Sequence, residues 1–393
     1  MKRFSANYIF PVNGHPIKNG IVVVNDNNII VDVIDPKGDV LELESMEFHN
    51  GVIVPGFVNA HCHIELSHLK KKLDNSAEGI AGFVSQIRTL RASTEFEIQK
   101  SIKQALSALD DNGTVAVGDI CNTTDSFLLK QTSKIYFHSF IEVFGLLPSE
   151  AELRYQNAKS LLNDALLVNK SSSLTPHATY SISDKLWNFI SNELSKTEST
   201  VSIHYGESMQ EYAFLKDRTG VLAENFKDLG IADGIASNTT PFEIVKKYLP
   251  KQNPTLFIHN TFVQRDEIKS IMSHFKSPFF VLCPSSNLFI EGKLPNVPLF
   301  IEEGACLAIG TDSFASSNTL SVFDQILILL ERFPILTFNE VNRWATLNGA
   351  KALNIESVFG SFEKGKKPGL NLITNFDFGQ MRPMAQSRVK RLI

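Results

Sequence analysis

The sequence predicts an α/β protein, a (β/α)8 TIM-like barrel that carries a small β-sandwich domain built from both chain ends. Short apolar runs alternate with amphipathic stretches over most of the 393 residues, which is typical of parallel strands connected by helices. Eight such runs follow residue 50, the number that closes a barrel of this type. Strand-like segments bounded by turn residues also occur at both chain ends, outside this alternation.

The two chain ends have an all-β pattern. The expected strands are residues 21–24, 29–34 and 46–48 at the N-terminal end and residues 370–374 and 388–393 at the C-terminal end. Asn-Gly pairs and clusters of Asn, Asp and Pro separate the first three, as expected for turns. We therefore expect residues 1–55 and 360–393 to form one composite small β domain and residues 56–359 to form the barrel.

The middle of the chain supplies the barrel. Its expected strands are residues 51–58, 113–120, 135–144, 173–176, 201–203, 255–258, 279–282 and 306–309. Its clearest expected helices are residues 80–90, 96–109, 150–167, 184–194 and 266–274. The segment 208–240 contains no expected strand and is long for a loop, so we expect either a lid or a plain surface insertion there.

Composition and charge exclude several classes of protein. Hydrophobic residues make up 43% and charged residues 20% of the chain, which excludes a disordered protein. The net charge of −4 argues against a general nucleic-acid or membrane-surface binder, because these need a basic face. The four cysteines form no CxxC pair, and the chain has neither a signal peptide nor an apolar run long enough to span a membrane. We expect a cytoplasmic protein with a small-molecule substrate and, by default for such enzymes, a homodimer.

The first chemical signal is the pair His61 and His63 at the end of an apolar run. Residues two apart on a strand point to the same face, and the carboxyl ends of barrel strands hold the active site. Imidazole nitrogens bind zinc and related divalent metals. Two structural histidines would explain this pair alone equally well.

Other residues at strand ends strengthen the prediction of a metal site. His177, His204 and His259 each lie at or just after an expected strand, and Asp312 follows the last one. Ten histidines placed at random in this chain would seldom coincide in this way. Glu207, three residues after His204, supplies a carboxylate able to take a proton from a metal-bound water; a surface salt bridge is the alternative for this residue.

Together these motifs resemble the amidohydrolase superfamily. The motifs are Pro-Gly-Phe-Val-Asn-Ala-His-Cys-His at 55–63, His-x-x-Glu at 204–207, His259, Gly-Thr-Asp-Ser at 310–313 and Ala-Thr-Leu-Asn-Gly-Ala at 345–350. The resemblance covers nearly the whole chain. It is closest to the deaminase and chlorohydrolase branch, which includes cytosine, guanine, adenosylhomocysteine and aminofutalosine deaminases.

The resemblance implies a site with one divalent metal ion. Its ligands would be His61, His63, His204 and Asp312. Glu207 would shuttle protons, His259 would hydrogen-bond the attacking water or the tetrahedral intermediate, and Asp312 would also accept the water's proton. The end of the fourth barrel strand has no lysine, the residue that binuclear branches use there, so we expect a single ion. Zinc is the first expectation, and iron(II) also fits a site of three histidines and one aspartate.

Three residues are candidates for substrate binding. His177 lies in Thr-Pro-His-Ala-Thr-Tyr at 175–180, which resembles a segment that contacts substrate in this branch, and Cys-Pro-Ser-Ser-Asn at 283–287 resembles one that frames the pocket. Glu65 could hydrogen-bond a polar ring edge, or it could be a solvent-facing acid at a helix start. Arg88 could meet an anionic substrate tail, or it could be an exposed helix charge. One departure from the family pattern is Pro368-Gly369, where relatives usually have Ala-Asp.

These residues predict a metal-dependent hydrolase. A divalent ion lowers the pKa of a bound water toward 7, and the resulting hydroxide would attack a ring carbon that bears an amino group. The expected activity is therefore a hydrolytic deaminase that releases ammonia from an aminated purine- or pyrimidine-like ring or nucleoside. The alternatives are hydrolysis of an amide, urea or carbon–halogen bond at the same site, or a barrel kept as a scaffold without metal.

Overall fold

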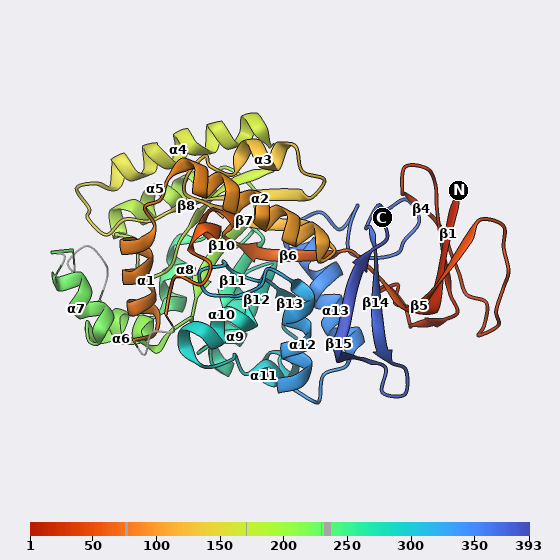
Figure 1. The fold of residues 1–393 in the computed structure, drawn as a ribbon. Coiled ribbons are helices and arrows are strands. Elements are labelled where there is room, and N and C mark those ends of the chain that lie inside the picture. Colours follow the sequence, from red (N-terminus) through yellow and green to blue (C-terminus); the bar gives the residue numbers. More distant parts are fainter. Residues whose placement is uncertain (75–77, 170, 229, 232–236) are drawn as a thin grey trace.

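The computed structural model describes residues 1–74, 78–169, 171–228, 230–231 and 237–393. Figure 1 shows a barrel with helices outside its strands on one side of the molecule and a separate sheet on the other side, where both termini lie. The strands form two four-stranded parallel sheets and one mixed seven-stranded sheet. The predicted fold class is confirmed.

The elements follow in chain order. The strands are β1 Lys2–Ile9, β2 Ile17–Lys18, β3 Ile21–Val24, β4 Ile30–Ile34, β5 Met46–Pro55, β6 Phe57–Cys62, β7 Thr114–Cys121, β8 Tyr136–Val143, β9 Ser172–Pro176, β10 Val201–Tyr205, β11 Thr255–His259, β12 Pro278–Leu282, β13 Leu307–Ile309, β14 Leu370–Asp377 and β15 Arg382–Arg391. The helices are η1 Ile64–Leu69, α1 Gly79–Leu90, α2 Glu95–Asp111, α3 Phe127–Gln131, α4 Ala151–Val168, α5 Asp184–Leu194, α6 Met209–Asp217, α7 Val221–Asp228, α8 Pro241–Tyr248, α9 Arg265–His274, α10 Pro284–Glu291, α11 Val297–Glu302, α12 Val322–Arg332, α13 Phe338–Arg343, η3 Trp344–Asn348 and α14 Gly349–Ala352.

Two four-stranded sheets, β6-β7-β8-β9 and β10-β11-β12-β13, make up the barrel. They meet at two seams, where single bridges join Cys62 to Asp312 and Ala178 to His204. At the first seam the amide of Asp312 donates to the carbonyl of His61 (3.1 Å), and at the second the amide of His204 donates to the carbonyl of His177 (2.8 Å). Residues predicted to bind metal or substrate therefore also close the barrel.

The two chain ends share one sheet, as predicted. Its strand order is β15-β14-β5-β1-β3-β4, and β2 pairs with β1. The structure shows one continuous mixed sheet where a sandwich was predicted. In this sheet β5 pairs antiparallel with β14 and parallel with β1. The residue boundaries of the two domains stay a prediction.

One expected barrel strand, residues 51–58, is two elements in the structure. Its first half belongs to β5 in the end sheet, and the barrel strand β6 begins only at Phe57. Gly56 lies between them, and its amide donates to the carbonyl of Pro368 (3.0 Å). A Cβ at Gly56 would lie 2.6 Å from that carbonyl oxygen and 2.3 Å from Val115 Cγ1. Glycine is needed here because the backbone crosses between two sheets with no room for a side chain. The neighbouring segment is Pro368-Gly369, which departs from the family pattern.

The long segment 208–240 is helical where the structure describes it. It holds α6 and α7, and its described residues form no strand, as expected. Residues 229 and 232–236 lie outside the described part. The amide of Gln210 donates to the carbonyl of Glu78 next to α1 (2.6 Å), so the segment touches α1. Whether it acts as a lid stays a prediction.

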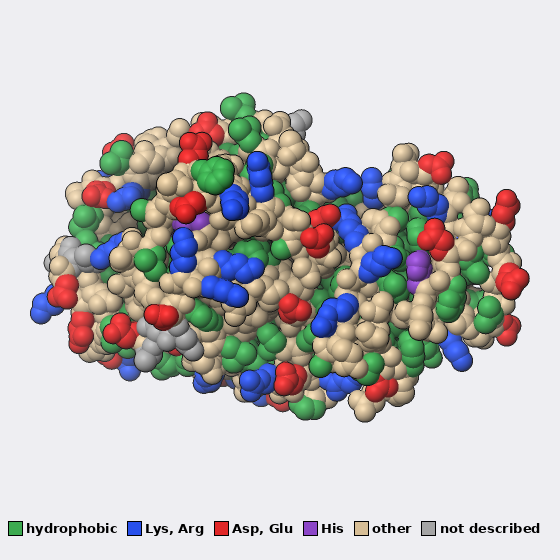
Figure 2. Space-filling view, in the orientation of Figure 1, with side chains coloured by type: hydrophobic (Ala, Val, Ile, Leu, Met, Phe, Trp, Pro, Cys, Tyr) green, Lys and Arg blue, Asp and Glu red, His purple; other side chains and the backbone are tan. Residues whose placement is uncertain are grey.

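The surface carries charges of both signs. Figure 2 shows Lys and Arg side chains over much of the visible face, with Asp and Glu side chains between them. Among the described residues, none of the helices is both long enough and apolar enough to cross a bilayer.

A buried ion pair between Lys130 and Asp119 holds the backbone that follows β6. Lys130 Nζ on α3 lies 2.5 Å from Asp119 Oδ2 on β7, and both side chains are almost completely buried. Burial would lower the pKa of Lys130, but the Asp119 carboxylate outweighs it and holds that pKa above 10.5. The other oxygen of Asp119 accepts the amide of Ile64 (2.8 Å). The pair therefore anchors the backbone directly after His63.

We expect Lys130→Met to lower the free energy of unfolding by about 3–5 kcal/mol, because it leaves the Asp119 carboxylate buried and unpaired. Urea denaturation measures this change. The control is Lys159→Met, which removes a more exposed pair with Glu193 and should cost about 1 kcal/mol or less. Equal losses in the two variants would contradict a special role for the buried pair.

Candidate metal centre

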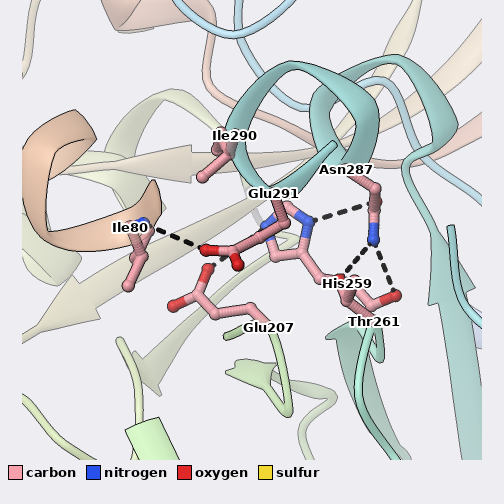
Figure 3. A pocket seen from close by; sticks show the side chains of 7 residues that line it. All are labelled: Ile80, Glu207, His259, Thr261, Asn287, Ile290 and Glu291. Carbon is pink, nitrogen blue, oxygen red and sulfur yellow. Dashed lines mark hydrogen bonds and ion pairs between the residues drawn. The ribbon is translucent and has the colours of Figure 1, made fainter. Parts of the chain in front are cut away.

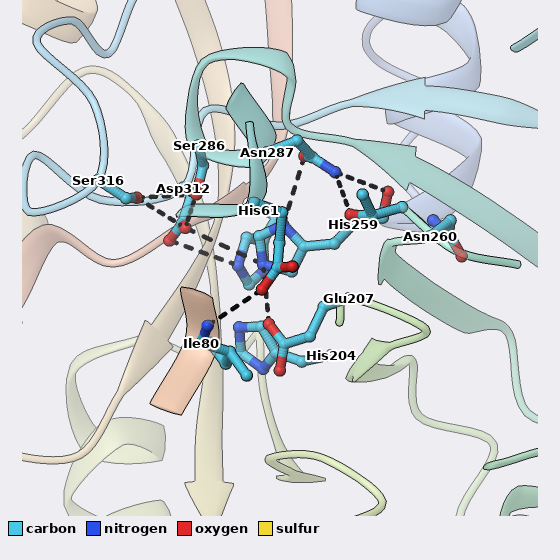
Figure 4. Close-up of polar contacts among 12 residues, drawn as sticks. His61, Ile80, His204, Glu207, His259, Asn260, Ser286, Asn287, Asp312 and Ser316 are labelled. Atoms are coloured by element: carbon cyan, nitrogen blue, oxygen red, sulfur yellow. Dashed lines mark hydrogen bonds and ion pairs between the residues drawn. The ribbon is translucent and has the colours of Figure 1, made fainter. Parts of the chain in front are cut away.

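Four predicted ligands converge at the carboxyl end of the barrel. His63 Nε2 lies 3.1 Å from His61 Nε2 and 3.3 Å from His204 Nε2. Asp312 Oδ1 lies 3.6 Å from His63 Nε2 and 3.9 Å from His61 Nε2. Figure 4 shows the imidazoles of His61 and His204 facing this point from opposite strands. His61 lies in β6 and His204 in β10, whereas His63 follows β6 and Asp312 follows β13. Their four donor atoms thus surround one small space.

The donor atoms fit a divalent cation. In tetrahedral zinc sites the ligand nitrogens are about 2.1 Å from the ion, which places neighbouring donors about 3.4 Å apart. The distances from His63 to His61, His204 and Asp312 and from His61 to Asp312, 3.1 to 3.9 Å, are close to that value. Three imidazoles and one carboxylate are also a common zinc donor set. The geometry therefore supports the predicted ligands, whose role stays a proposal.

Burial prepares the imidazoles for this role. It lowers the pKa of His61 and of His204 well below 6.5, and the neighbouring imidazoles lower both further. Neutral imidazoles keep a lone pair for a cation, so no proton competes for it at neutral pH. The Nδ1 atom of His204 lies 3.0 Å from the carbonyl of His177. That hydrogen bond leaves the lone pair of His204 on Nε2, which faces the cluster.

Asp312 is held as an anion. Burial would raise its pKa, but the nearby imidazoles of His63 and His259 outweigh burial and lower it. The hydroxyls of Ser286 and Ser316 donate to Asp312 Oδ2 at 2.5 Å and 2.9 Å. The other carboxylate oxygen, Oδ1, accepts the backbone amide of Ser313 (2.7 Å) and also faces the imidazoles of His61 and His63.

The backbone is strained where these side chains leave their strands. His259, Asn260 and Asp312 have φ values of +72°, +56° and +57°, in the left-handed region. Such conformations cost about 1–3 kcal/mol for most residues other than glycine, although Asn and Asp tolerate them more readily. Local bonds hold them: the Asn260 side-chain amide donates to the carbonyl of Phe257 (2.7 Å). The fold therefore places His259 and Asp312 at a cost, which supports a functional use.

Glu207 lies beside the cluster and accepts a short hydrogen bond from Tyr180. The hydroxyl of Tyr180 donates to Glu207 Oε1 (2.5 Å), and Oε2 lies 3.7 Å from His259 Nε2. The backbone amide of Glu207 donates to Glu211 (3.2 Å). Burial, and then the charge of Glu211, raise the pKa of Glu207 well above 4.5. Glu207 can therefore carry a proton at neutral pH.

A small pocket lies next to Glu207 and His259. Figure 3 shows its lining: Ile80, Glu207, His259, Thr261, Asn287, Ile290 and Glu291. Asn287 donates to the carbonyl of His259 (3.2 Å) and to Thr261 (2.6 Å), and so holds the imidazole in place. The sequence indicated Asn287 as part of the pocket frame, whereas Ile80, Thr261 and Glu291 belong to no motif and were missed.

The three predicted substrate-binding residues lie at different distances from the cluster. The His177 ring is close, with its centroid 4.8 Å from that of His204. The Glu65 carboxylate accepts the amides of Asn122 (2.9 Å) and Thr123 (3.0 Å) instead of facing the cluster. Arg88 is exposed on α1, and no contact in the described part of the chain joins it to the cluster. The roles of all three in substrate binding stay predictions.

Two residues near the cluster were missed by the sequence reasoning. Arg91, just after α1, lies 3.6 Å from Glu65. Glu142, near the end of β8, lies 3.7 Å from His204 Nδ1. The only sequence signal for Glu142 is a charged residue inside an otherwise apolar expected strand.

Comparison with known proteins gives a consistent result. The model of the amidohydrolase family matches residues 52–388. An adenosine deaminase of Helicobacter pylori is 27% identical over 336 residues, which cover 84% of this chain and 80% of the relative. The structure of H. pylori aminofutalosine deaminase in complex with methylthio-coformycin is similar, with a TM-score of 0.82, 22% identity and full coverage of both chains. An adenosine deaminase structure from Xanthomonas campestris with bound zinc has a TM-score of 0.72 and 20% identity over 98% of this chain and 87% of that one.

We expect His61→Ala to lose most of the bound metal, because it removes one of the four proposed donors. Metal content per chain, measured by mass spectrometry after dialysis, checks this. The matched control is His138→Gln, which changes a buried β8 histidine bonded to Ser173 outside the cluster. Full metal content in His61→Ala would remove this residue from the ligand set.

Proposed function

The chain belongs to the amidohydrolase family, and on that premise we propose that it is a metal-dependent hydrolytic deaminase of amino-substituted purine nucleosides. The observation that carries the proposal is the position of Glu207. This residue is a protonatable carboxyl beside the four-donor cluster, and it lines the adjacent pocket. Hydrolytic removal of an amino group needs such a proton carrier next to a metal.

His61, His63, His204 and Asp312 would hold the ion. When bound, a divalent cation supplies hydroxide at neutral pH and polarises the attacked bond. The four donors come from the two seams of the barrel. They are therefore placed by the closure of the barrel itself, before substrate arrives.

Glu207 would move the protons. It takes the proton released by the attacking water and gives it to the ring nitrogen adjacent to the reacting carbon. It then takes the remaining hydroxyl proton of the added water and passes it to the departing amino group, so that the carbon–oxygen bond is kept, the carbon–nitrogen bond breaks and ammonia leaves. The Tyr180 hydroxyl on Glu207 Oε1 directs the second oxygen of Glu207 toward the cavity and His259.

His259 and Asp312 would stabilise the attacked carbon from the opposite side. His259 Nε2 lies 3.7 Å from Glu207 Oε2 and 4.0 Å from Asp312 Oδ2. A substrate oxygen formed between these groups would be within reach of a hydrogen bond from the imidazole. Asn287 fixes that imidazole through the carbonyl of the same residue, so the donor is positioned in advance, which is where such stabilisation gains most.

The relatives favour an adenosine-like substrate over the alternatives. A relative from Helicobacter pylori is named an adenosine deaminase, and a similar solved structure is an aminofutalosine deaminase. No feature of the described residues favours cleavage of an amide, urea or carbon–halogen bond over deamination. These reactions are therefore outcomes of the test below and not second proposals.

Ammonia release from a substrate panel tests the function. We expect metal-loaded protein to release ammonia from adenosine and 5′-substituted adenosines, and much less from guanine and cytosine. Ammonia is measured by a coupled assay, and loss of the amino group by the shift in ultraviolet absorbance. Halide release from a chlorinated triazine with no ammonia from any amino compound would contradict the proposal.

We expect Glu207→Gln to keep its metal but to lower kcat by roughly 10²–10⁴-fold, because the amide cannot carry the proton. The control is Glu193→Gln, which alters a carboxylate bonded to Tyr155 on the outer helices. Both variants are assayed at equal metal content. Turnover near the unmodified level in Glu207→Gln would refute the proton-carrying role.

A further inference from the structure

Glu142 is a buried carboxylate that the proposed mechanism does not use. It lies near the end of β8 and is 8% exposed. Its Oε2 accepts a hydrogen bond from the Asn122 side-chain amide (3.0 Å). Its Oε1 is buried and has no hydrogen-bond partner among the described residues. A buried acceptor without a donor is costly, so a donor from outside the chain is expected there.

His204 does not supply that donor. Its Nδ1 is 3.7 Å from Glu142 Oε1, which is too long for a hydrogen bond. A neutral imidazole has a single N–H group. In His204 this group lies on Nδ1 and is directed to the carbonyl of His177 at 3.0 Å.

His177 places a second acceptor beside Glu142. The Ser181 hydroxyl lies 3.2 Å from the carbonyl of Ala178 and donates to it, so Ser181 Oγ accepts the Nδ1–H of His177 (2.8 Å). The lone pair of His177 is then on Nε2. Glu142, His177 and His204 each offer a ligand atom within 4.8 Å of the other two. An acceptor that has no donor among the described residues, Glu142 Oε1, therefore stands beside the lone pair of His177.

A run of polar contacts holds Glu142 in this position. Arg91 donates to Asn122 Oδ1 at 3.4 Å and lies 3.6 Å from Glu65. Asn122 in turn donates to Glu142. The four residues come from η1, the end of α1, the end of β7 and β8. They fix one oxygen of Glu142 and leave the other facing His177 and His204.

We propose that Glu142, together with His177, binds the sugar hydroxyls of the substrate, so that the enzyme selects nucleosides with a free vicinal diol. A vicinal diol carries two O–H donors on neighbouring carbons, which matches two adjacent acceptors. This inference rests on the proposed function and specifies its substrate class.

The position of the subsite suits a nucleoside. Glu207 and His259 follow β10 and β11, whereas Glu142 and His177 lie at the ends of β8 and β9, on the other flank of His204. A purine whose amino-bearing carbon is at the cluster and whose ring nitrogen faces Glu207 would extend its sugar toward the β8 and β9 flank. Phe144, whose ring centroid is 5.9 Å from that of His177, adds an apolar surface there.

The test compares substrates that differ by one hydroxyl. Adenosine, 2′-deoxyadenosine and 3′-deoxyadenosine are assayed with the unmodified enzyme, with Glu142→Gln and with the surface control Glu150→Gln, all at equal metal content. We expect removal of a hydroxyl to lower kcat/KM by about 10–100-fold in the unmodified enzyme and in Glu150→Gln, as for a hydrogen bond to a charged group. In Glu142→Gln the difference between adenosine and at least one deoxynucleoside should shrink to a few-fold.

Other outcomes overturn the inference. If Glu142→Gln lowers kcat/KM equally for all three nucleosides, Glu142 acts only through His204. If the unmodified enzyme deaminates all three equally, no hydroxyl subsite exists, and this result does not depend on whether the variant folds. Two metal ions per chain, with one lost in Glu142→Gln, would show that the acceptors bind a cation. If no nucleoside releases ammonia at all, the proposed function fails and not the subsite alone.

Discussion

The structure depends on how its barrel closes. Two parallel four-stranded sheets are joined by single bridges, Cys62 with Asp312 and Ala178 with His204. The same backbone bonds that close the barrel set the directions of His61, His204 and Asp312. A chain that has not closed the barrel has no cluster, because the donors come from strands about 140 to 250 residues apart in sequence. Folding and assembly of the site are therefore one event.

Closure also buries the site, and burial sets its chemistry. Histidines out of water are neutral and keep their lone pairs, whereas Asp312 stays ionised because imidazoles and two serine hydroxyls surround it. The pKa of Glu207 shifts in the opposite direction, because burial raises it and the carboxylate of Glu211 raises it further. One low-dielectric space thus holds an anion and a protonatable acid side by side, as acid–base chemistry near neutral pH requires.

Much of the fold followed from local patterns. All eight expected barrel strands overlap observed strands of the barrel, although residues 51–58 do so only at their last two positions, and α5 has the expected bounds. The error at residues 51–58 arose because one apolar run crosses from β5 to β6, and only the contact of Gly56 with Pro368 separates them. The strand β1 escaped prediction because its buried residues Phe4, Ser5 and Ala6 are consecutive and do not alternate with exposed ones. For the site, the histidines were visible as strand-end residues, whereas Glu142 and Arg91 belong to no motif.

The sequence by itself determined which residue types stand at the ends of which strands, because a two-residue period and strand-end positions are local properties of the chain. It therefore indicated His61, His63, His204, His259, Glu207 and Asp312. Only the tertiary structure decided which oxygen or nitrogen of each side chain is occupied and which is free. That depends on partners distant in sequence, such as Tyr180 for Glu207 and Asn122 for Glu142. The physical reason is that hydrogen bonds are directional and are satisfied in space, not along the chain.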